Sequence, residues 1–432
     1  MSAPTAPWTS AAALVTAALA TGDGFDPFAA FSDATGASGG DPRTHWHGLL
    51  ETAPLHEGTV PPPGGESMSD LMFGQGPVCT AVGYDAVNEV LRTPEVFSSS
   101  ILGNTVGLVW GRTIIQMDEP EHARYRKLIQ RAFTRKEMDR WEGIAVPNLH
   151  AFLDAIVDRG RGELVQDLLL SYPITVIADA IGLPREDVPL FFRLAVEMSI
   201  ITLDPMRALT ASQDLAAYLT GQIAARRAAP GPDLLTSLIE AELPAGEDGA
   251  GQKLTEDEIV SFIRLLLIAG AETTSRSSAT LLMLLLAHPE QYAAIAADRS
   301  LIPAAIEEAL RFEAPLTAAF RIASTDGELA GCPVPEGKAV ISLLGAANRD
   351  PARWPNPDVF DIHREQRAHL SFSGGPHLCL GMHVARTEMR VVLEAALDRM
   401  PGLRLDPDAP APVVTGRDLR SPARLDVVWD AT

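Results

Sequence analysis

The chain has 432 residues, 46% of them hydrophobic, and a formal net charge of −21 at pH 7. This negative charge excludes nucleic acid and anionic membrane surfaces as bulk partners. A chain of this length buries enough apolar surface to fold without disulfides or a structural metal. Its three cysteines are too few and too far apart for a disulfide framework. We therefore expect a globular protein of a reducing compartment, the cytoplasm.

The sequence carries no clear membrane signal. No lysine or arginine precedes Arg43, so the basic start of a secretory signal peptide is missing. The most apolar segment, residues 259–287, contains Arg264, Glu272 and Arg276, which the middle of a membrane span would not tolerate. The segment therefore predicts a buried helix and no membrane anchor.

The start of the chain differs in composition from the rest. Residues 1–75 are rich in Gly, Pro, Ala and Ser, which predicts an irregular lead-in with short helices. No such shift marks a linker further on, so we expect residues 76–432 to form one large domain.

Elements of the first half follow from apolar spacing. Residues 77–83 predict a strand, and residues 84–97 predict a helix that breaks at Pro94. Glycines among apolar side chains predict a flexible, unpacked loop from Ser98 to Gln116. From Glu119 to Arg227 the pattern is helical, and helix breaks are predicted at Pro147, Pro173, Pro184 and Pro205.

The second half begins with a polar loop, residues 244–253, and then the longest predicted helix. Thr255 and Glu258 form a capping box, the residues after it are apolar nearly all round, and Pro289 ends the helix. About thirty residues at roughly 1.5 Å each give about 50 Å, enough to cross the molecule.

Beyond this helix, a shorter helix is predicted over residues 302–312 and β-hairpins over residues 320–345. Residues 346–376 look irregular, a helix is expected from about Cys379 to Met400, and the last thirty residues predict a short β region. The fold class is therefore mainly α with a smaller β region.

The strongest local motif is FSGGPHLCLG, residues 372–381. Gly374 and Gly375 allow the backbone to approach a ligand closely. A cysteine at a helix N-terminus is favoured as a thiolate, which makes Cys379 a candidate metal ligand or nucleophile. An inert buried cysteine beside a turn fits these residues equally well.

The pattern formed by Phe372, Gly375, His377, Cys379 and Gly381 resembles the haem-binding loop of cytochromes P450. The resemblance implies a P450 fold in which a long central helix crosses above haem b and the Cys379 sulfur is the axial iron ligand. Many family members have glycine where this chain has Ser373, which puts the local loop shape in doubt.

AGAETT, residues 269–274, lies in the middle of the long helix. Its residues alone favour a structural interpretation, in which Glu272 pairs with Arg276 and Thr273 bonds back to the preceding turn. The segment resembles the oxygen-binding helix of the family. The resemblance implies that Thr273 and Glu272 serve dioxygen activation and proton delivery, while Ala269 and Gly270 leave room for dioxygen.

Two further groups match the family. Glu308 and Arg311 share one helix face at i,i+3, which is common for surface ion pairs; the resemblance implies a structural lock beside the Cys loop. The resemblance also implies that two haem propionates are held by His122, Arg126, Arg321 and His377. Scattered surface charges are the alternative for these four residues.

The resemblance covers roughly residues 77 to 400. It implies a monooxygenase that inserts one oxygen atom into an organic substrate, with electrons that come from NAD(P)H through a separate ferredoxin and its reductase, or a flavodoxin. Such partners are acidic, so we expect a basic patch drawn from Arg124, Lys127, Arg131 and Arg390. A peroxide-driven peroxygenase and a non-catalytic haem protein are the alternatives; the Glu272–Thr273 pair favours neither.

By family analogy, residues around the long helix line a substrate pocket, and plain core packing is the alternative for each of them. The candidates are Val109, Trp110, Met198, Leu267, Ala271, Leu316 and Thr317. Most are apolar, so we expect a small to medium hydrophobic substrate.

Overall fold

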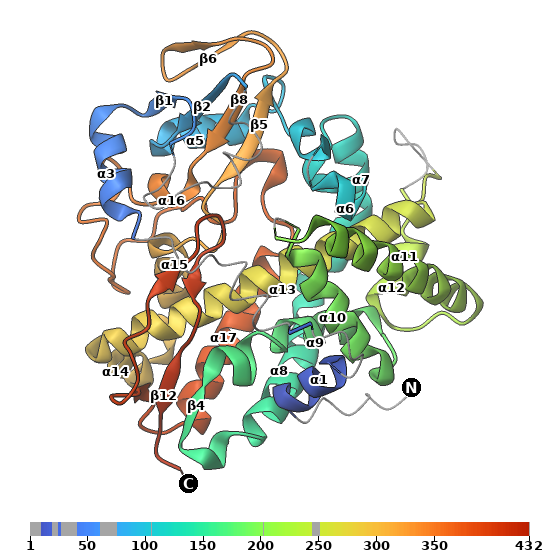
Figure 1. Ribbon diagram of the computed structural model, residues 1–432, viewed down its shortest axis with the longest axis vertical. Coiled ribbons are helices and arrows are strands. Elements are labelled where there is room, and N and C mark those ends of the chain that lie inside the picture. The colour runs from blue at the N-terminus through green and yellow to red at the C-terminus, as the bar shows by residue number, and fades with distance from the viewer. Residues whose placement is uncertain are drawn as a thin grey trace.

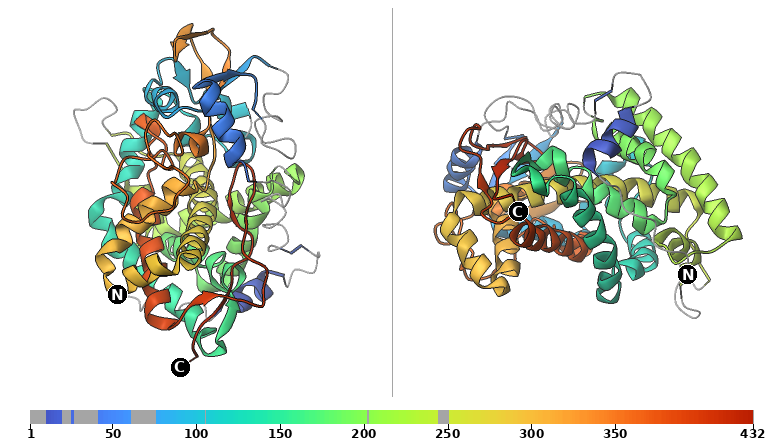
Figure 2. Two further views of the ribbon diagram at one scale, coloured as in Figure 1. Left: turned by 90° about the vertical axis from the view of Figure 1, so that its left-hand side faces the viewer. Right: turned by 90° about the horizontal axis from the view of Figure 1, so that it is seen from below.

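The computed structural model describes residues 10–19, 25–26, 41–60, 76–104, 106–201, 203–243 and 251–431. Much of the expected lead-in, residues 1–75, and most of the expected loop at 244–253 lie outside these ranges. Within them the chain is mainly helical, with its largest sheet at one end of the molecule and a smaller sheet toward the other end (Figures 1 and 2).

Helix α13 (Glu256–Ala287) crosses the middle of the molecule (Figure 1). The Thr255 hydroxyl accepts from the Glu258 N–H at 3.2 Å, and the Glu258 carboxylate accepts from the Thr255 N–H at 2.7 Å. The predicted capping box is therefore confirmed, as is the predicted length, because α13 has 32 residues. Its sides pack against α9 (Tyr172–Ile181), α15 (Ile302–Phe312) and α17 (Met382–Arg399).

The helices around α13 share the largest hydrophobic core of the molecule. Other described α-helices are α1 (Ala11–Leu19), α3 (Arg43–Thr52), α5 (Tyr84–Arg92), α6 (Gly107–Trp110), α7 (Glu121–Ile129), α8 (Met138–Asp154), α10 (Val188–Ser199), α11 (Pro205–Ala228), α12 (Leu234–Glu240), α14 (Pro289–Ala297) and α16 (Leu344–Ala347). Among the residues described, no helix is both long and apolar enough to cross a membrane.

A five-stranded sheet has the order β1-β2-β8-β5-β3. Its strands are β1 (Leu55–Glu57), β2 (Val78–Ala81), β3 (Phe97–Ser98), β5 (Ala319–Ala323) and β8 (Ala339–Ser342). Strands β2 and β8 run parallel, and the other neighbours are antiparallel; Arg321 on β5 lies opposite Val340 on β8. The sheet packs on α5 and α16 in a second hydrophobic core.

Smaller sheets complete the β structure. They are the hairpin β6 (Gly327–Leu329) with β7 (Cys332–Val334), the sheet β4 (Arg161–Glu163), β12 (Asp426–Val428) and β9 (Arg404–Leu405), and the pair β10 (Val414–Thr415) and β11 (Ser421–Pro422). The strands predicted between residues 320 and 345 and the C-terminal β region are confirmed.

The predicted helix break at Pro147 is wrong, because Pro147 lies inside α8. Proline removes one backbone donor and crowds the preceding turn, which leaves carbonyl groups there without their helical partners. The Asn148 side chain donates to the Ile144 carbonyl at 3.1 Å and to Asp179 at 2.7 Å. The second bond ties this turn of α8 to α9, and the helix continues through Pro147.

The predicted unpacked loop from Ser98 to Gln116 is also wrong in part. The segment contains the 3-10 helices η1 (Ser100–Asn104) and η2 (Ile114–Gln116) and the short helix α6. The buried Gln116 amide donates to the Gly111 carbonyl at 2.5 Å. A Cβ at Gly107 would lie 2.7 Å from Gln116 Oε1. The glycines therefore let the chain wrap closely around one buried amide.

Candidate functional site

The Cys379 loop joins the irregular segment before it to α17. Its ends are tied by a hydrogen bond from the Cys379 N–H to the Phe372 carbonyl at 2.9 Å. The 3-10 turn η9 (Gly375–His377) lies between them, and α17 begins at Met382. The helix expected from about Cys379 therefore begins three residues later, and Cys379 itself lies in the loop that precedes it.

Gly375 fixes the position of this loop against α5. Its φ is +61°, and a Cβ there would clash with the Leu91 carbonyl oxygen. Glycine is thus required for contact with the protein itself, which is a different reason from the close ligand approach inferred from the sequence. Gly374 has an extended backbone, and a Cβ there would lie 3.6 Å from Leu91 Cβ, an ordinary contact.

Two positive charges lie near the Cys379 sulfur. Burial raises the pKa of the Cys379 thiol, while a hydrogen bond from the Gly381 backbone and the charges of Arg126 and Arg386 lower that pKa. Arg126 on α7 also donates to the Leu378 carbonyl at 2.8 Å. The loop thus favours a thiolate through its backbone and two arginines, but the protein alone does not offset the cost of burial.

The four residues expected to bind carboxylates converge beside this loop. The rings of His122 and His377 lie 4.4 Å apart, and the Arg321 side chain is buried. Burial, followed by the charges of Arg321, His122 and Arg126, lowers the pKa of His377 to about 3. Mutual repulsion of this kind shows that the four groups share one space, so scattered surface charges are excluded for them.

The cluster retains unused hydrogen-bond donors. Within the described part of the chain, His122 Nε2 is buried and has no partner, while His122 Nδ1 lies 3.2 Å from Glu119. Burial lowers the pKa of Arg321 to about 10, and its guanidinium donates to the Phe320 carbonyl at 2.7 Å. Buried donors without acceptors are costly, so the cluster fits an anionic group with several oxygens, such as the propionates of haem.

The centre of α13 presents an accessible stripe. Ala269 is exposed and Gly270 and Thr273 are half-buried, whereas Ala271 and Thr274 are buried. The Thr273 hydroxyl donates to the Ala269 carbonyl at 2.6 Å. An otherwise buried helix therefore offers small residues and one hydroxyl to open space.

Glu272 is buried and pairs with Arg276 at 2.5 Å. Arg276, itself fully buried, also donates to the Ser421 hydroxyl at 3.1 Å. The pairing of Glu272 and the back-bond of Thr273 are the two contacts of the structural alternative, and both are present. Gly270 also has a packing reason to be small, because a Cβ there would lie 3.1 Å from the Ile177 side chain on α9.

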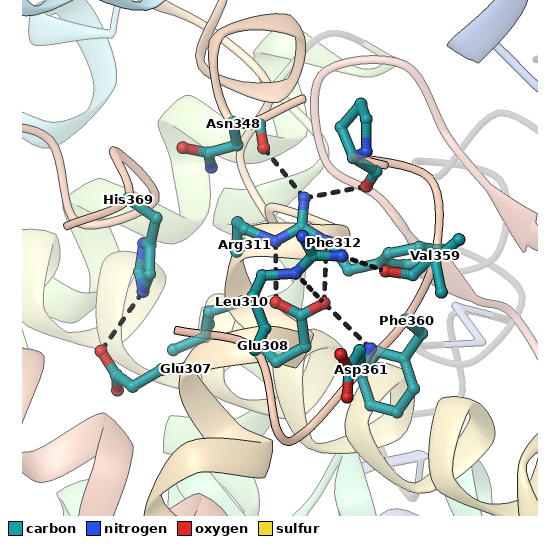
Figure 3. A network of polar contacts seen from close by, with 12 residues as sticks. Glu307, Glu308, Leu310, Arg311, Phe312, Asn348, Val359, Phe360, Asp361 and His369 are labelled. Atoms are coloured by element: carbon teal, nitrogen blue, oxygen red, sulfur yellow. Dashed lines mark hydrogen bonds and ion pairs between the residues drawn. The ribbon is translucent and has the colours of Figure 1, made fainter. Parts of the chain in front are cut away.

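Glu308 and Arg311 form a buried ion pair, with exposed side-chain fractions of 2% and 3% (Figure 3). Both contacts of the bidentate pair measure 2.8 Å. Glu308 also accepts from Arg364 at 3.1 Å, and Arg311 donates to the Asn348 and Pro357 carbonyls. The pair is therefore not a surface pair; it joins α15 to the irregular segment ahead of the Cys379 loop.

The expected substrate-pocket residues fall into two groups. Met198, Leu267 and Ala271 are buried in the main hydrophobic core, and Trp110 packs against that core. Val109 is buried, and its carbonyl accepts from Ser212 on α11. Leu316 is 38% exposed and Thr317 is buried, with its hydroxyl donating to the Arg417 carbonyl at 2.8 Å. The residues in or against the main core, Met198, Leu267, Ala271 and Trp110, therefore have the contacts expected of core packing.

Several site residues were not identified from the sequence. Ser99 lies 3.0 Å from His377 Nε2, although 278 positions separate the two residues. Arg364 joins Glu308, and Arg386 lies near Cys379. Arg386 follows the motif by one helical turn and could have been noticed; Ser99 carries no local signal.

Comparison with known proteins gives consistent results. A family model described as cytochrome P450 matches residues 206–400. The cytochrome P450 monooxygenase PikC of Streptomyces venezuelae is 35% identical over 341 residues, which cover 76% of this chain and 79% of that protein. Vitamin D3 dihydroxylase of Streptomyces griseolus is 38% identical over 321 residues, 74% of this chain and 77% of that protein.

Solved structures share the whole fold. Substrate-free CYP109E1 from Bacillus megaterium matches with a TM-score of 0.80 and 28% identity, over 91% of this chain and 99% of that one. CYP109Q5 from Chondromyces apiculatus matches with a TM-score of 0.79 and 30% identity, over 91% of this chain and 96% of that one. By sequence, fold and the arrangement around Cys379, the chain belongs to the cytochrome P450 family and is a P450 monooxygenase.

Proposed function

We propose that this monooxygenase binds haem b through Cys379 and inserts one atom of dioxygen into a small to medium hydrophobic substrate, by hydroxylation or epoxidation. The proposal places the catalytic domain in residues 76–432. The observation that carries it is the convergence of four cationic or hydrogen-bonding side chains, with an orphaned donor on His122, beside the Cys379 loop.

In this proposal, His122, Arg126, Arg321 and His377 bind the two propionates and so orient the ring. Phe372, Gly375 and Gly381 shape the loop that presents the Cys379 sulfur to the iron. Haem held by a thiolate supplies the activation of dioxygen. Glu308 and Arg311 hold the preceding segment in place, a structural role.

Thr273 and Glu272 are the proposed proton-handling residues. The Thr273 hydroxyl holds its proton toward the Ala269 carbonyl, and it is the accessible hydroxyl of the stripe on α13. Glu272, the residue before it, is buried and paired with Arg276, since an unpaired buried carboxylate would be costly. A proton passed to the substrate side of α13 would leave from Thr273 Oγ1, and Glu272 would help to return a proton to that oxygen, directly or through water.

The substrate class rests on the apolar candidate residues and on the relatives. Val109, Trp110, Leu267, Ala271 and Leu316 are among the residues proposed to meet the substrate, together with Met198 and Thr317. The Streptomyces griseolus relative is named vitamin D3 dihydroxylase, and CYP109E1 from Bacillus megaterium was also solved in complex with testosterone. Vitamin D3 and testosterone are both bulky apolar molecules, which supports a hydrophobic substrate for this chain.

Electrons are proposed to come from NAD(P)H through a separate ferredoxin and its reductase, or through a flavodoxin. Of the four residues expected to form a basic docking patch, Arg124 pairs with Glu258 at 2.6 Å, and Arg390 pairs with Glu142 and Glu394. Because Lys127 and Arg131 are exposed whereas Arg124 and Arg390 are half-buried, we narrow the proposed patch to Lys127 and Arg131.

The first test is spectroscopic. The purified protein is reduced with dithionite and exposed to carbon monoxide, and the difference spectrum is recorded. We expect a Soret band strongly red-shifted from that of a histidine-ligated haem, present in the matched control Cys332→Ala and absent in Cys379→Ala. Cys332 is exposed and lies on the β6–β7 hairpin, outside the loop, so its loss should not matter. A histidine-type band, or no bound haem, would refute the proposal.

A further inference from the structure

The ring of Phe372, which opens the Cys379 loop, is flanked by two groups that share one carboxylate. The Arg386 guanidinium on α17 lies 4.5 Å from the centre of the ring, and the His369 ring lies 5.7 Å from it. Glu307 on α15 receives two hydrogen bonds from Arg386, at 2.6 and 2.8 Å. It also lies 3.4 Å from His369 Nε2 (Figure 3). We call Glu307, His369 and Arg386 the Phe372 clamp.

The clamp is a firmly held ion pair. Burial alone would raise the pKa of Glu307, but the hydrogen bonds from Arg386 and the contact with His369 outweigh it and lower that pKa to about 2. The Arg386 side chain is 31% exposed, so without Glu307 it has water within reach. The bidentate geometry therefore holds the guanidinium against the ring and away from solvent.

The position of Arg386 matters because of its charge. The Arg386 guanidinium lies over the ring of Phe372, and the Phe372 carbonyl accepts the Cys379 N–H at 2.9 Å. Arg386 is also one of the two arginines whose charge lowers the pKa of the Cys379 thiol. A fixed positive charge there stabilises added negative charge at a thiolate-bound iron, and so favours the reduced state.

We propose that Glu307 is a positioning residue that sets the reduction potential of the bound haem by holding Arg386 against Phe372 and beside Cys379. This inference rests on the proposed ligation of haem by Cys379. It concerns neither the propionate cluster nor the Glu308–Arg311 lock. Glu307 acts through Arg386 and touches no reacting atom.

The test is the reduction potential of the haem-loaded protein, measured by spectroelectrochemical titration of wild type and variants. In Glu307→Gln the arginine loses its anchor and moves into water, so the potential should fall. Simple loss of a negative charge, with Arg386 still in place, would raise it instead. Arg386→Gln should lower the potential, and the double variant should lie no lower than Arg386→Gln alone.

Glu394→Gln is the matched control, because Glu394 lies on α17 like Arg386 and pairs with another arginine of that helix, Arg390, at 2.9 Å. Its potential should equal that of wild type. Glu307→Asp should restore part of the shift. If Glu307→Gln does not retain haem, Arg386→Lys decides the question: a lysine cannot form the bidentate pair or stack on the ring, so the potential should again fall.

An unchanged or raised potential in Glu307→Gln, or an unchanged potential in Arg386→Lys, would overturn the inference. The carbon monoxide spectrum of the wild type separates the two levels of failure. A wild type without the thiolate band would refute the proposed function. If the wild type shows that band but the clamp variants have the same reduction potential as the wild type, only the role of Glu307 is refuted.

Discussion

Ser373, the position where the motif departs from many relatives, has a φ of +61°. This left-handed conformation is unfavourable for residues other than glycine, because the Cβ crowds the backbone. The Ser373 N–H donates to the Leu370 carbonyl at 2.8 Å, so the turn is kept in spite of its cost. The sequence raised a doubt about the loop shape here; the structure shows a closed turn in which Ser373 adopts a conformation that glycine would adopt more easily.

Ser373→Gly should therefore stabilise the loop, by up to about 1 kcal/mol after the extra flexibility of the unfolded glycine is deducted. The measurement is the temperature at which the holoprotein loses its haem Soret band. Ser373→Ala is the control, since it removes the hydroxyl and keeps the Cβ. A rise in Ser373→Ala equal to that in Ser373→Gly would contradict an origin in backbone strain.

Thr273 gives the second residue-scale prediction. Thr273→Ala removes the accessible hydroxyl of the α13 stripe and should reduce product formed per electron pair consumed by about tenfold or more, within the usual range for a lost proton donor. Thr273→Ser keeps a hydroxyl that can bond the Ala269 carbonyl and should retain most of the yield. Product and oxygen consumption are measured together; full coupling in Thr273→Ala would remove Thr273 from the proton path.

At the scale of elements, the sequence predicted what is decided locally. The α13 capping box needs only residues 255 and 258, and the apolar spacing of α5 and α15 is complete within each helix. The errors arose where a distant or side-chain contact decides. The turn of α8 at Pro147 is tied to Asp179 on α9, and the segment before α17 is held in a loop by the bond from the Cys379 N–H to the Phe372 carbonyl.

The contact between the Cys379 loop and α5 gives the element-scale prediction. Gly375→Ala introduces a Cβ that clashes with the Leu91 carbonyl at a positive φ, so the loop should shift and the protein should retain severalfold less haem. Gly374→Ala, one residue away, meets only an ordinary contact and should retain haem as the wild type does. Haem content per protein is measured; equal retention by both variants would show that α5 does not position the loop.

At the scale of the whole molecule, the family, the helical fold and the order of the motifs could be predicted from the sequence, but contacts between distant residues could not. Ser99 beside His377, and Arg364 beside Glu308, are brought together by the tertiary fold alone. Charge illustrates the same limit: Arg124 and Arg390 look like docking residues in the sequence, yet each has a carboxylate partner in the structure.

The double variant Lys127→Glu, Arg131→Glu reverses both charges of the proposed docking patch. At low salt it should be reduced by a ferredoxin about tenfold or more slowly than the wild type, and the difference should become smaller as salt is added. Arg299→Glu is the control, because Arg299 follows α14 on the other side of the molecule from α7 (Figure 1). Reduction by dithionite should be unaffected in all variants. An unchanged ferredoxin rate would place the electron donor elsewhere.

The residues proposed to grip the haem begin with His122 on α7 and end with Cys379, and α13 lies between them in the chain. When the ribosome has synthesised the first half of the chain, only His122 and Arg126 of these residues have therefore been made. At about 5–20 residues per second, the synthesis of Cys379 follows that of His122 by roughly 13–50 seconds. Haem capture must come near the end of synthesis, and a nascent chain that stalls before α17 would expose an unfilled apolar interior to the cell's chaperones and proteases.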